Sequence, residues 1–296
     1  MSVPQRIAIT GASGLIGTAL VGHLKSEGHT VQRLVRRAPI SADEVQWDPQ
    51  TGFVDLEPLR GVDAIIHLAG VGVGDKRWSK KYKAEILNSR LLGTTAIAHA
   101  VAELKPQVFI SASAIGWYGE SGNRAVVETD RAGDDFLAAV CREWEGAADL
   151  AGEVRTVKIR TGLVLDPTGG ALGKMLPLFR LGLGGKMGNG KQWWSWITLH
   201  DQIRAIVFAL ENPISGPVNL TAPNPVTNQE FTSALARAMR RPALFPVPGI
   251  ALKIALGGFS SEILGSKKVI PHALQEAGFT WDYPHISEAL GKLVED

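Results

Sequence analysis

Three glycines near the N-terminus have the spacing of a dinucleotide-binding loop. In TGASGLIG, Gly11, Gly14 and Gly17 follow an apolar segment and open a segment with helical periodicity. The first allows a tight turn, the second lets the backbone approach a pyrophosphate, and the third lets helix pack on strand. A structural turn is the alternative, but the flanking pattern favours phosphate binding at the helix N-terminus. The predicted contacts are Gly11, Ser13, Gly14, Leu15, Ile16 and Gly17.

Arginines follow the next strand-like segment, where an enzyme that uses NAD would usually carry an acid for the ribose hydroxyl. The segment RLVRRAP contains Arg33, Arg36 and Arg37, and the first acid after it is Asp43. A guanidinium suits a 2′-phosphate. We therefore predict NADP as the cofactor, with contacts from Arg36 and Arg37, whereas Arg33 is more simply a solvated residue of the strand.

Strand-like and helical segments alternate through the first 165 residues. Apolar strands are expected at 6–10, 30–35, 62–69, 108–113 and 154–165. Amphipathic helices are expected between them, among them 79–104 and 134–150. This alternation predicts an α/β fold, a Rossmann-type doubly wound parallel sheet with helices on both faces. We expect residues 1–165 to form an NADP-binding Rossmann domain.

The sequence changes character after Asp166. Residues 169–192 are rich in glycine, and helical periodicity returns at 201–211 and 228–240. Prolines then mark a linker-like stretch, and the last residues read as a small helical tail. We expect 166–296 to form a smaller C-terminal substrate-side region, including a C-terminal helical module at about 248–296.

The overall composition and charge indicate which classes of binding partner the protein has. The 296 residues are 45% hydrophobic and 20% charged, with a net charge of +2 and no conspicuous basic tract. This composition predicts binding of a small molecule, with no nucleic-acid and no membrane partner. The single cysteine, Cys141, and an N-terminus without a signal-peptide pattern are compatible with a cytoplasmic protein. The seven histidines lack metal-ligand spacing, so no metal site is expected.

Five motifs together resemble the extended, atypical short-chain dehydrogenase/reductases of the NAD-dependent epimerase/dehydratase superfamily. They are the glycine loop, HLAG (67–70), NSRLLGT (88–94), SASAIGWYG (111–119) and IRTGLVLD (159–166). The segment VIPHALQEAGFTWDYP (269–284) is similar to the C-terminal helical module of a sugar-nucleotide epimerase-like subgroup, the epimerase family proteins. The resemblance spans nearly the whole chain.

The resemblance implies further cofactor contacts and an orientation. NADP is expected between the two regions, with its nicotinamide facing residues 113–118. Arg90 stands where many members have asparagine. The implied cofactor contacts are Arg36, Leu68, Ala69, Gly70, Glu85, Arg90, Ser111, Ala112 and Ser113.

The proton-transfer pair of the superfamily is missing from its expected helix. Members carry Tyr-x-x-x-Lys there, and the ammonium makes the phenol easier to ionise. In DDFLAAVCREWE (134–145), Phe136 or Leu137 falls at the tyrosine. The lysine is likewise replaced by valine or cysteine. We predict instead that Tyr118 donates the proton, polarised by Ser113 or the nicotinamide ribose. Local packing of Tyr118 is the alternative.

A tryptophan-rich segment, KQWWSWITLHD, precedes a helical segment in the substrate-side region. Strand alternation puts Trp194 and Trp196 on one side, where they could contact a planar or sugar ring. Two functions follow from the sequence. One is an NADP-dependent oxidoreductase or nucleotide-sugar epimerase-like enzyme that acts on a small substrate, for which a nucleotide-linked molecule is one option. The other is a non-catalytic NADP-binding sensor or regulatory protein.

Overall fold

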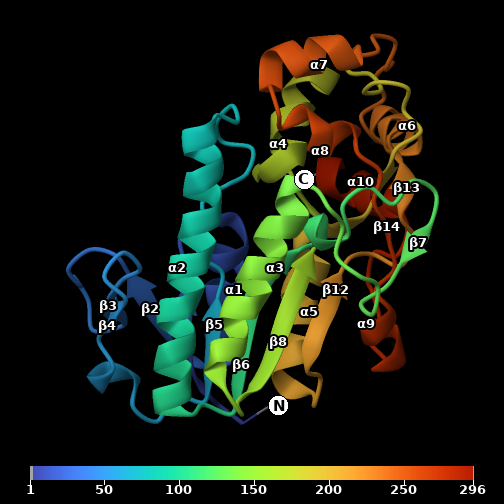
Figure 1. Ribbon diagram of the computed structural model, residues 1–296. Coiled ribbons are helices and arrows are strands. Elements are labelled where there is room, and N and C mark those ends of the chain that lie inside the picture. Colours follow the sequence, from blue (N-terminus) through green and yellow to red (C-terminus); the bar gives the residue numbers. More distant parts are fainter. Residues whose placement is uncertain (1–2, 296) are drawn as a thin grey trace.

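A central sheet of eight strands organises the chain in a computed structural model, which describes residues 3–295 (Figure 1). The strand order is β12-β8-β6-β5-β1-β2-β3-β4, and every neighbouring pair is parallel except β3 and β4. The predicted Rossmann-type, parallel-dominated α/β sheet is confirmed. The strands are β1 (Arg6–Thr10), β2 (Thr30–Val35), β3 (Glu44–Asp48), β4 (Phe53–Val54), β5 (Ala64–His67), β6 (Val108–Ala114), β8 (Arg155–Thr161) and β12 (Gly216–Leu220).

Helices cover both faces of this sheet, which is why its strands are apolar on both sides. α1 (Leu15–Ser26) and α5 (Leu199–Glu211) pack on one face through a shared buried cluster that includes Leu20 and Ile206. α2 (Lys80–Leu104) and α3 (Phe136–Ala148) lie on the other face (Figure 1). Ser79 caps α2 by accepting a hydrogen bond from the Tyr82 N–H, as the expected start at 79 requires.

The long strand expected at 154–165 is in fact two strands. β8 ends at Thr161, and β9 (Leu163–Asp166) leaves the sheet to pair with β11 (Trp196–Thr198). Gly162 lies at the break, and a Cβ there would lie 2.7 Å from the Ser195 carbonyl oxygen, so a glycine allows this close approach. Apolar character alone did not indicate it, because both strands are apolar.

The expected boundary near residue 165 does not separate the sheet from the rest. β12 belongs to the later region, yet it pairs in parallel with β8 at the edge of the sheet. Much of the later region packs around a separate buried cluster, which contains Trp196 and Phe231, whereas Leu274 belongs to the same cluster as Leu20 and Ile206. Besides α5, the helices of this region are α4 (Gly170–Arg180), α6 (Asn228–Ala238), α7 (Gly249–Leu256), α8 (Ser260–Leu264), α9 (His272–Glu276) and α10 (Ile286–Glu295).

Among the described residues, no helix has both the length and the apolar character that crossing a bilayer requires.

Candidate cofactor and substrate site

The three loop glycines differ in why they must be small. Gly11 has φ +71°, and a Cβ on it would lie 2.8 Å from the Leu68 carbonyl carbon. A Cβ on Gly17 would lie 2.1 Å from the Gly11 oxygen. The fold itself therefore requires both. At Gly14 the nearest described atom would be the Gly11 oxygen at 3.4 Å, an ordinary contact. A ligand that approaches the backbone would explain this third glycine.

The start of α1 is open to an anion. Gly14 is the N-cap residue, and no described side chain caps this helix. Its first N–H groups therefore lack side-chain acceptors, and the helix dipole favours negative charge there. Ser13 and Gly14 are exposed, while Leu15 and Ile16 are half-buried. This arrangement fits a pyrophosphate beside the loop, and the individual contacts expected there stay predictions.

The three arginines after β2 have different partners. Arg33 binds Asp43 with two nitrogens, each at 3.1 Å. Arg37 donates to both carboxylate oxygens of Glu44, at 2.7 and 2.6 Å. The expected cofactor contact from Arg37 is therefore not supported, because its guanidinium is already paired. Arg36 is exposed and makes no hydrogen bond or ion pair with any residue in 3–295. Of the three, Arg36 is the one left free for a 2′-phosphate.

The loop after β5 lies directly against the glycine loop. The Thr10 hydroxyl accepts hydrogen bonds from the N–H groups of Leu68, at 3.1 Å, and Ala69, at 3.3 Å. These bonds fix the close approach of Leu68 to Gly11. Gly70 follows at the exposed surface. The structure therefore brings the predicted contacts Leu68, Ala69 and Gly70 to the edge of the sheet that carries the glycine loop.

Two predicted contacts come from α2. Arg90 donates to the carbonyl oxygens of Val71, at 2.9 Å, and Ile86, at 3.1 Å. Its guanidinium carbon lies 4.7 Å from the centroid of the Trp144 ring, and burial lowers its pKa. Arg90 thus holds the loop after β5 in place. Glu85 is exposed on the helix surface, 3.7 Å from a lysine ammonium.

The end of β6 enters a closed network of buried polar groups. The Ser113 hydroxyl donates to Glu145 at 2.7 Å, and Glu145 also accepts from Arg160 at 2.8 and 2.9 Å. Arg160 donates to the Tyr118 hydroxyl at 3.1 Å, which in turn donates to Asn219 at 2.7 Å. All five side chains are buried. We call them the Ser113–Asn219 network.

This network gives both predicted catalytic hydroxyls a structural partner. The Tyr118 residue is 4% exposed, and burial raises its pKa to about 12 although Arg160 opposes the shift. The expectation that Tyr118 donates the proton, with Ser113 as its polarising partner, is not supported by these contacts. Local packing, the alternative, describes Tyr118 better. Ser111 is buried and Ala112 half-buried on the same strand, and their cofactor contacts remain predictions.

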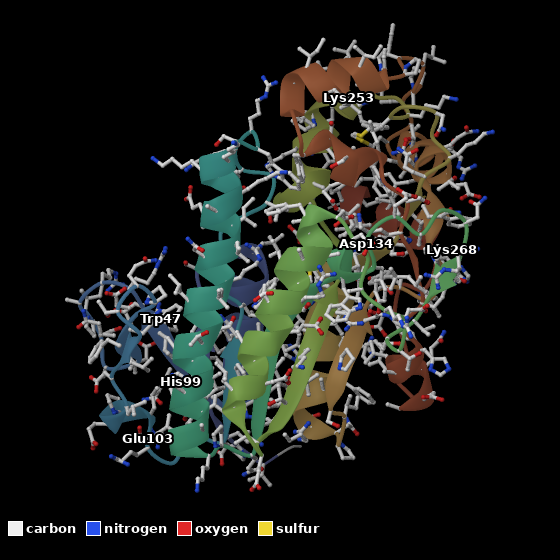
Figure 2. All side chains as sticks on the ribbon, in the orientation of Figure 1. Trp47, His99, Glu103, Asp134, Lys253 and Lys268 are labelled. Atoms are coloured by element: carbon white, nitrogen blue, oxygen red, sulfur yellow. The ribbon has the colours of Figure 1, made fainter. Side chains whose placement is uncertain are left out.

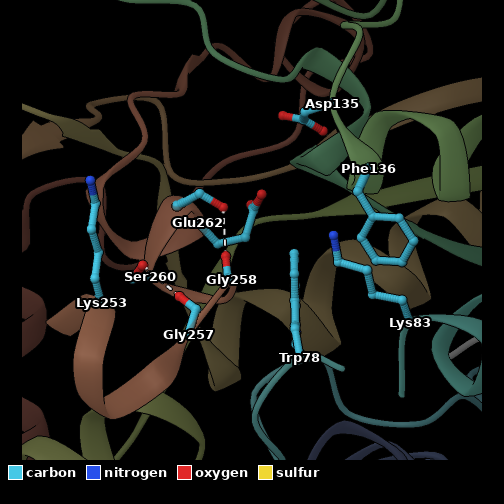
Figure 3. Close-up of a pocket in the computed structure, with 10 residues that line it drawn as sticks. Trp78, Lys83, Asp135, Phe136, Lys253, Gly257, Gly258, Ser260 and Glu262 are labelled. Atoms are coloured by element: carbon cyan, nitrogen blue, oxygen red, sulfur yellow. Dashed lines mark hydrogen bonds between the residues drawn. The ribbon is translucent and has the colours of Figure 1, made fainter. Parts of the chain in front are cut away.

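The helix that lacks the tyrosine–lysine pair borders a cavity of about 530 Å³ (Figure 3). Phe136, at the start of α3, lines it together with Trp78 and Lys83 on the α2 side. Residues of α7 and α8 close the opposite wall, among them Lys253 and Glu262. Cys141, farther along α3, is buried, and burial raises its pKa to about 12. The cavity thus lies between the Rossmann layers and the C-terminal helices.

Lys83, a residue of α2, is a cation of this cavity that lies beside Phe136. Its Nζ lies 4.7 Å from the centroid of the Phe136 ring and 5.3 Å from that of Trp78. No ion pair joins Lys83 to a carboxylate of the described chain. The two acids of the wall have other partners, since Asp135 accepts from the Ala138 N–H and Glu262 from Lys267. The cavity therefore offers cationic and aromatic groups to a ligand.

Neither predicted tryptophan contact lines this cavity. Trp196 is 0% exposed, and its indole N–H donates to the Asn224 carbonyl oxygen at 3.2 Å. The expected substrate contact from Trp196 is wrong because the ring is core. Trp194 packs on Phe231 at 5.2 Å between centroids and donates to the Ile263 carbonyl oxygen. Alternation correctly put these two rings on one side, but that side faces the C-terminal core.

Sequence reasoning missed the groups that pair with the predicted hydroxyls and those that line the cavity. Arg160 had a signal, since a charged residue inside a central parallel strand needs a buried partner. Glu145 lay next to the apolar stripe of its helix, without a visible partner. Lys83 and Trp78 lay in KRWSKKYK, which reads as an ordinary solvated helix start.

Comparison with known proteins agrees with this geometry. Residues 7–138 match the NAD dependent epimerase/dehydratase family, and residues 247–293 match a domain of unknown function, DUF1731. An epimerase family protein of Mycobacterium bovis is 46% identical over 96% of each chain. The chain belongs to the NAD-dependent epimerase/dehydratase family. Within it, the DUF1731 match corresponds to the predicted C-terminal helical module and covers α7, α8, α9 and most of α10.

Solved structures of the family share the whole fold. The human epimerase family protein SDR39U1, solved with NADPH, superposes with a TM-score of 0.91 at 32% identity, covering 98% of this chain and 99% of that one. A Corynebacterium glutamicum nucleoside-diphosphate sugar epimerase superposes at 0.79 with 36% identity. This chain is covered to 98% there but spans only 58% of that longer protein. The predicted resemblance is confirmed.

Proposed function

We propose that this family member binds NADP(H) at the glycine loop and uses it as an oxidoreductase or nucleotide-sugar epimerase-like enzyme on a small substrate. One observation carries the cofactor proposal. Arg36 is free at the end of β2 while Arg33 and Arg37 are both paired with acids. An unpaired guanidinium at this position suits a 2′-phosphate. The NADPH in the human relative supports the same reading.

The residues present fit this cofactor along its length. The open start of α1 would hold the pyrophosphate, and the space beside Gly14 would admit it. Leu68 and Ala69 would flank the adenosine side. Bound NADP(H) supplies or accepts a hydride, and the chain must provide the matching proton.

Lys83 is the proton donor that we propose. It faces the cavity beside Phe136, one of the two residues that the resemblance aligns with the missing tyrosine, and an ammonium carries protons to donate. Trp78 and Phe136 limit water around it. Substrate would bind in the same cavity, between Lys83 and Lys253. This proposal replaces Tyr118, whose hydroxyl is occupied inside the Ser113–Asn219 network.

The direct test compares NADPH and NADH binding by titration calorimetry. A charge-assisted hydrogen bond is worth about 1.5–3 kcal/mol, or roughly a ten- to hundredfold preference for NADPH. Equal dissociation constants would refute the NADP assignment. A screen of carbonyl substrates with NADPH then tests for turnover. Lys83→Met should lower the chemical step by about 10²–10⁴-fold, the usual contribution of a general acid. Lys81→Met is the matched control, because Lys81 belongs to the same helix but does not line the cavity.

A non-catalytic NADP-binding sensor is the second candidate. The closed Ser113–Asn219 network favours it, since the hydroxyls nearest the expected nicotinamide are tied to structural partners. Firm NADPH binding without turnover of any carbonyl or sugar nucleotide would support this function. Conformational change on cofactor binding, read by hydrogen exchange at α7 and α8, would then be the expected output.

A further inference from the structure

Acidic and basic residues are unevenly distributed along this chain. Residues 167–200 and 231–261 contain no aspartate or glutamate. Together they carry eight of the 31 lysines and arginines, namely Lys174, Arg180, Lys186, Lys191, Arg237, Arg240, Arg241 and Lys253. The other residues contain 23 basic side chains and all 29 acids, a net charge of −6. The small overall charge of +2 led to the expectation of no membrane partner. It is the sum of a positive charge in these two segments and a negative charge in the rest of the chain.

The cations of these segments are available to an external partner, although Lys253 also lines the cavity described above. None forms an ion pair with a carboxylate in the part of the chain that the structure describes. All are exposed except Lys186, which is half-buried. Cations elsewhere are often paired, as Arg60 is with Glu57. Soluble surfaces usually intersperse the two signs of charge, so segments that carry exposed cations and no acids point to an anionic partner.

Large apolar side chains are exposed in the same two segments. Ile250 and Ile254 are 73% and 69% exposed, one turn apart on the outer side of α7, while Leu252 between them is buried. Seven of the twelve large hydrophobic residues that are exposed in the described structure lie here. They are Leu178, Leu181, Leu183, Leu244, Phe245, Ile250 and Ile254.

Backbone hydrogen bonds hold the two segments side by side. The Val247 N–H donates to the Lys186 oxygen at 2.8 Å, and the Gly188 N–H donates to the Val247 oxygen at 2.9 Å. α7 and the end of α4 lie at the extremity of the molecule opposite the N-terminus (Figure 1). Figure 2 shows Lys253 on this end, with side chains of α7 projecting outward. We call the exposed residues of 174–191 and 237–254 the basic–apolar tip.

We propose that the basic–apolar tip docks on the surface of a membrane that carries anionic lipid headgroups. A short helix with aliphatic residues on its outer side can insert them at the headgroup level while nearby cations meet the lipid phosphates. A second copy of the chain fits less well, because a symmetric contact would oppose eight cations with eight. A nucleic acid would use the cations, but not exposed aliphatic side chains, since bases stack on aromatic ones.

The test is vesicle flotation of the full chain. Vesicles of phosphatidylcholine with about 30% phosphatidylserine should bind it at 0.1 M salt, and phosphatidylcholine alone should not. Each cation near an anionic surface contributes roughly a fivefold change in affinity, so Arg240→Gln with Arg241→Gln should weaken binding about 25-fold. Ile250→Ser with Ile254→Ser should weaken it about tenfold or more. All four side chains are exposed, so these variants should fold.

Matched controls come from outside the tip. Ile40→Ser with Leu150→Ser removes two exposed aliphatic residues, and Lys81→Gln with Arg131→Gln removes two exposed cations. Both should float as the parent does. NADPH affinity should be the same in every tip variant, which separates this proposal from the proposed function. Failure to bind either vesicle overturns the proposal. The proposal is also overturned if the arginine variants bind vesicles as the parent does but lose a dimer, or a complex with an oligonucleotide, that the parent forms.

Discussion

The glycine loop and the Ser113–Asn219 network lie at the same edge of the sheet. They differ in whether their polar groups have hydrogen-bond partners within the protein. At the loop, the start of α1 lacks a side-chain cap and Arg36 lacks a protein partner. In the network, every named side chain is buried and hydrogen-bonded to another. Groups left without partners at a concave edge are available to a ligand, whereas groups that satisfy one another stabilise the fold.

This difference separates two kinds of functional prediction. Backbone geometry and free charge support the cofactor loop directly. Tyr118 and Ser113 have the right chemistry and position, but their protons are already used in bonds to Asn219 and Glu145. The following experiments test how far the two regions are independent.

Breaking the buried ion pair should have the largest effect. Glu145→Gln leaves the buried Arg160 guanidinium without a counter-charge, which typically costs about 3–5 kcal/mol of unfolding free energy. Denaturant unfolding measures this loss. Replacing both partners, Glu145→Leu with Arg160→Met, should cost clearly less, since no charge stays unpaired. If the single variant were as stable as the parent, the network would not be structural.

Alkaline pH should destabilise the protein through two groups near α3. Burial raises the pKa of Cys141 from 9.0 to about 12 and that of Tyr118 from 10.0 to about 12. The folded state thus binds these protons more tightly than the unfolded state. Their contribution to the free energy of unfolding is complete below pH 9 and is lost as pH rises toward 12. Cys141→Ala should therefore lose less unfolding free energy between pH 9 and 12 than the parent does. If the variant and the parent had the same pH profile of stability, ionisation of Cys141 would not be a cause of the loss.

Gly14→Val should separate ligand binding from folding. The fold leaves space at Gly14, so unfolding free energy should change little while NADPH affinity falls about 100-fold, the value of one or two charge-assisted hydrogen bonds. Gly17→Ala is the contrast, since its Cβ would lie 2.1 Å from a carbonyl oxygen and should disrupt the fold. Calorimetry measures the NADPH affinity of both variants, and denaturant unfolding measures their stability. Equal stability loss in both variants would assign Gly14 to the fold.

Arg36→Ala should have the most selective effect. NADPH affinity should fall about ten- to hundredfold, while NADH affinity should barely change. Arg37→Ala is the matched control, because it removes a side chain paired with Glu44 and should leave both affinities nearly unchanged. A larger loss in Arg37→Ala than in Arg36→Ala would reverse the assignment.

The sequence was most informative where periodicity and backbone geometry decide the structure. The parallel sheet, its two helical faces and the glycine loop followed from apolar runs and glycine spacing. The short strand β3 was missed, because EVQWD is brief and mixes polar with apolar residues. Side-chain partners were harder, since Arg37 and Glu44 meet only after the chain turns back into β3.

The roles of Tyr118 and Trp196 depended on contacts between distant segments. Asn219, which accepts from Tyr118, is 101 positions later, and Trp196 is covered by helices that follow it. No local pattern reports such partners. Predicted helices, in contrast, held to within a few residues, because their apolar stripes and caps are local features.

The position of β12 has a consequence for shortened forms of the chain. β12 covers one side of β8, although 54 residues separate the end of β8 from the start of β12 in the sequence. A fragment that stopped near residue 165 would keep the pairing of β8 with β6 but leave the N–H and C=O groups of β8 that face β12 without partners. Such an open edge pairs readily with strands of other molecules. Partial proteolysis or early termination between these strands should therefore yield an aggregating product rather than a working cofactor domain.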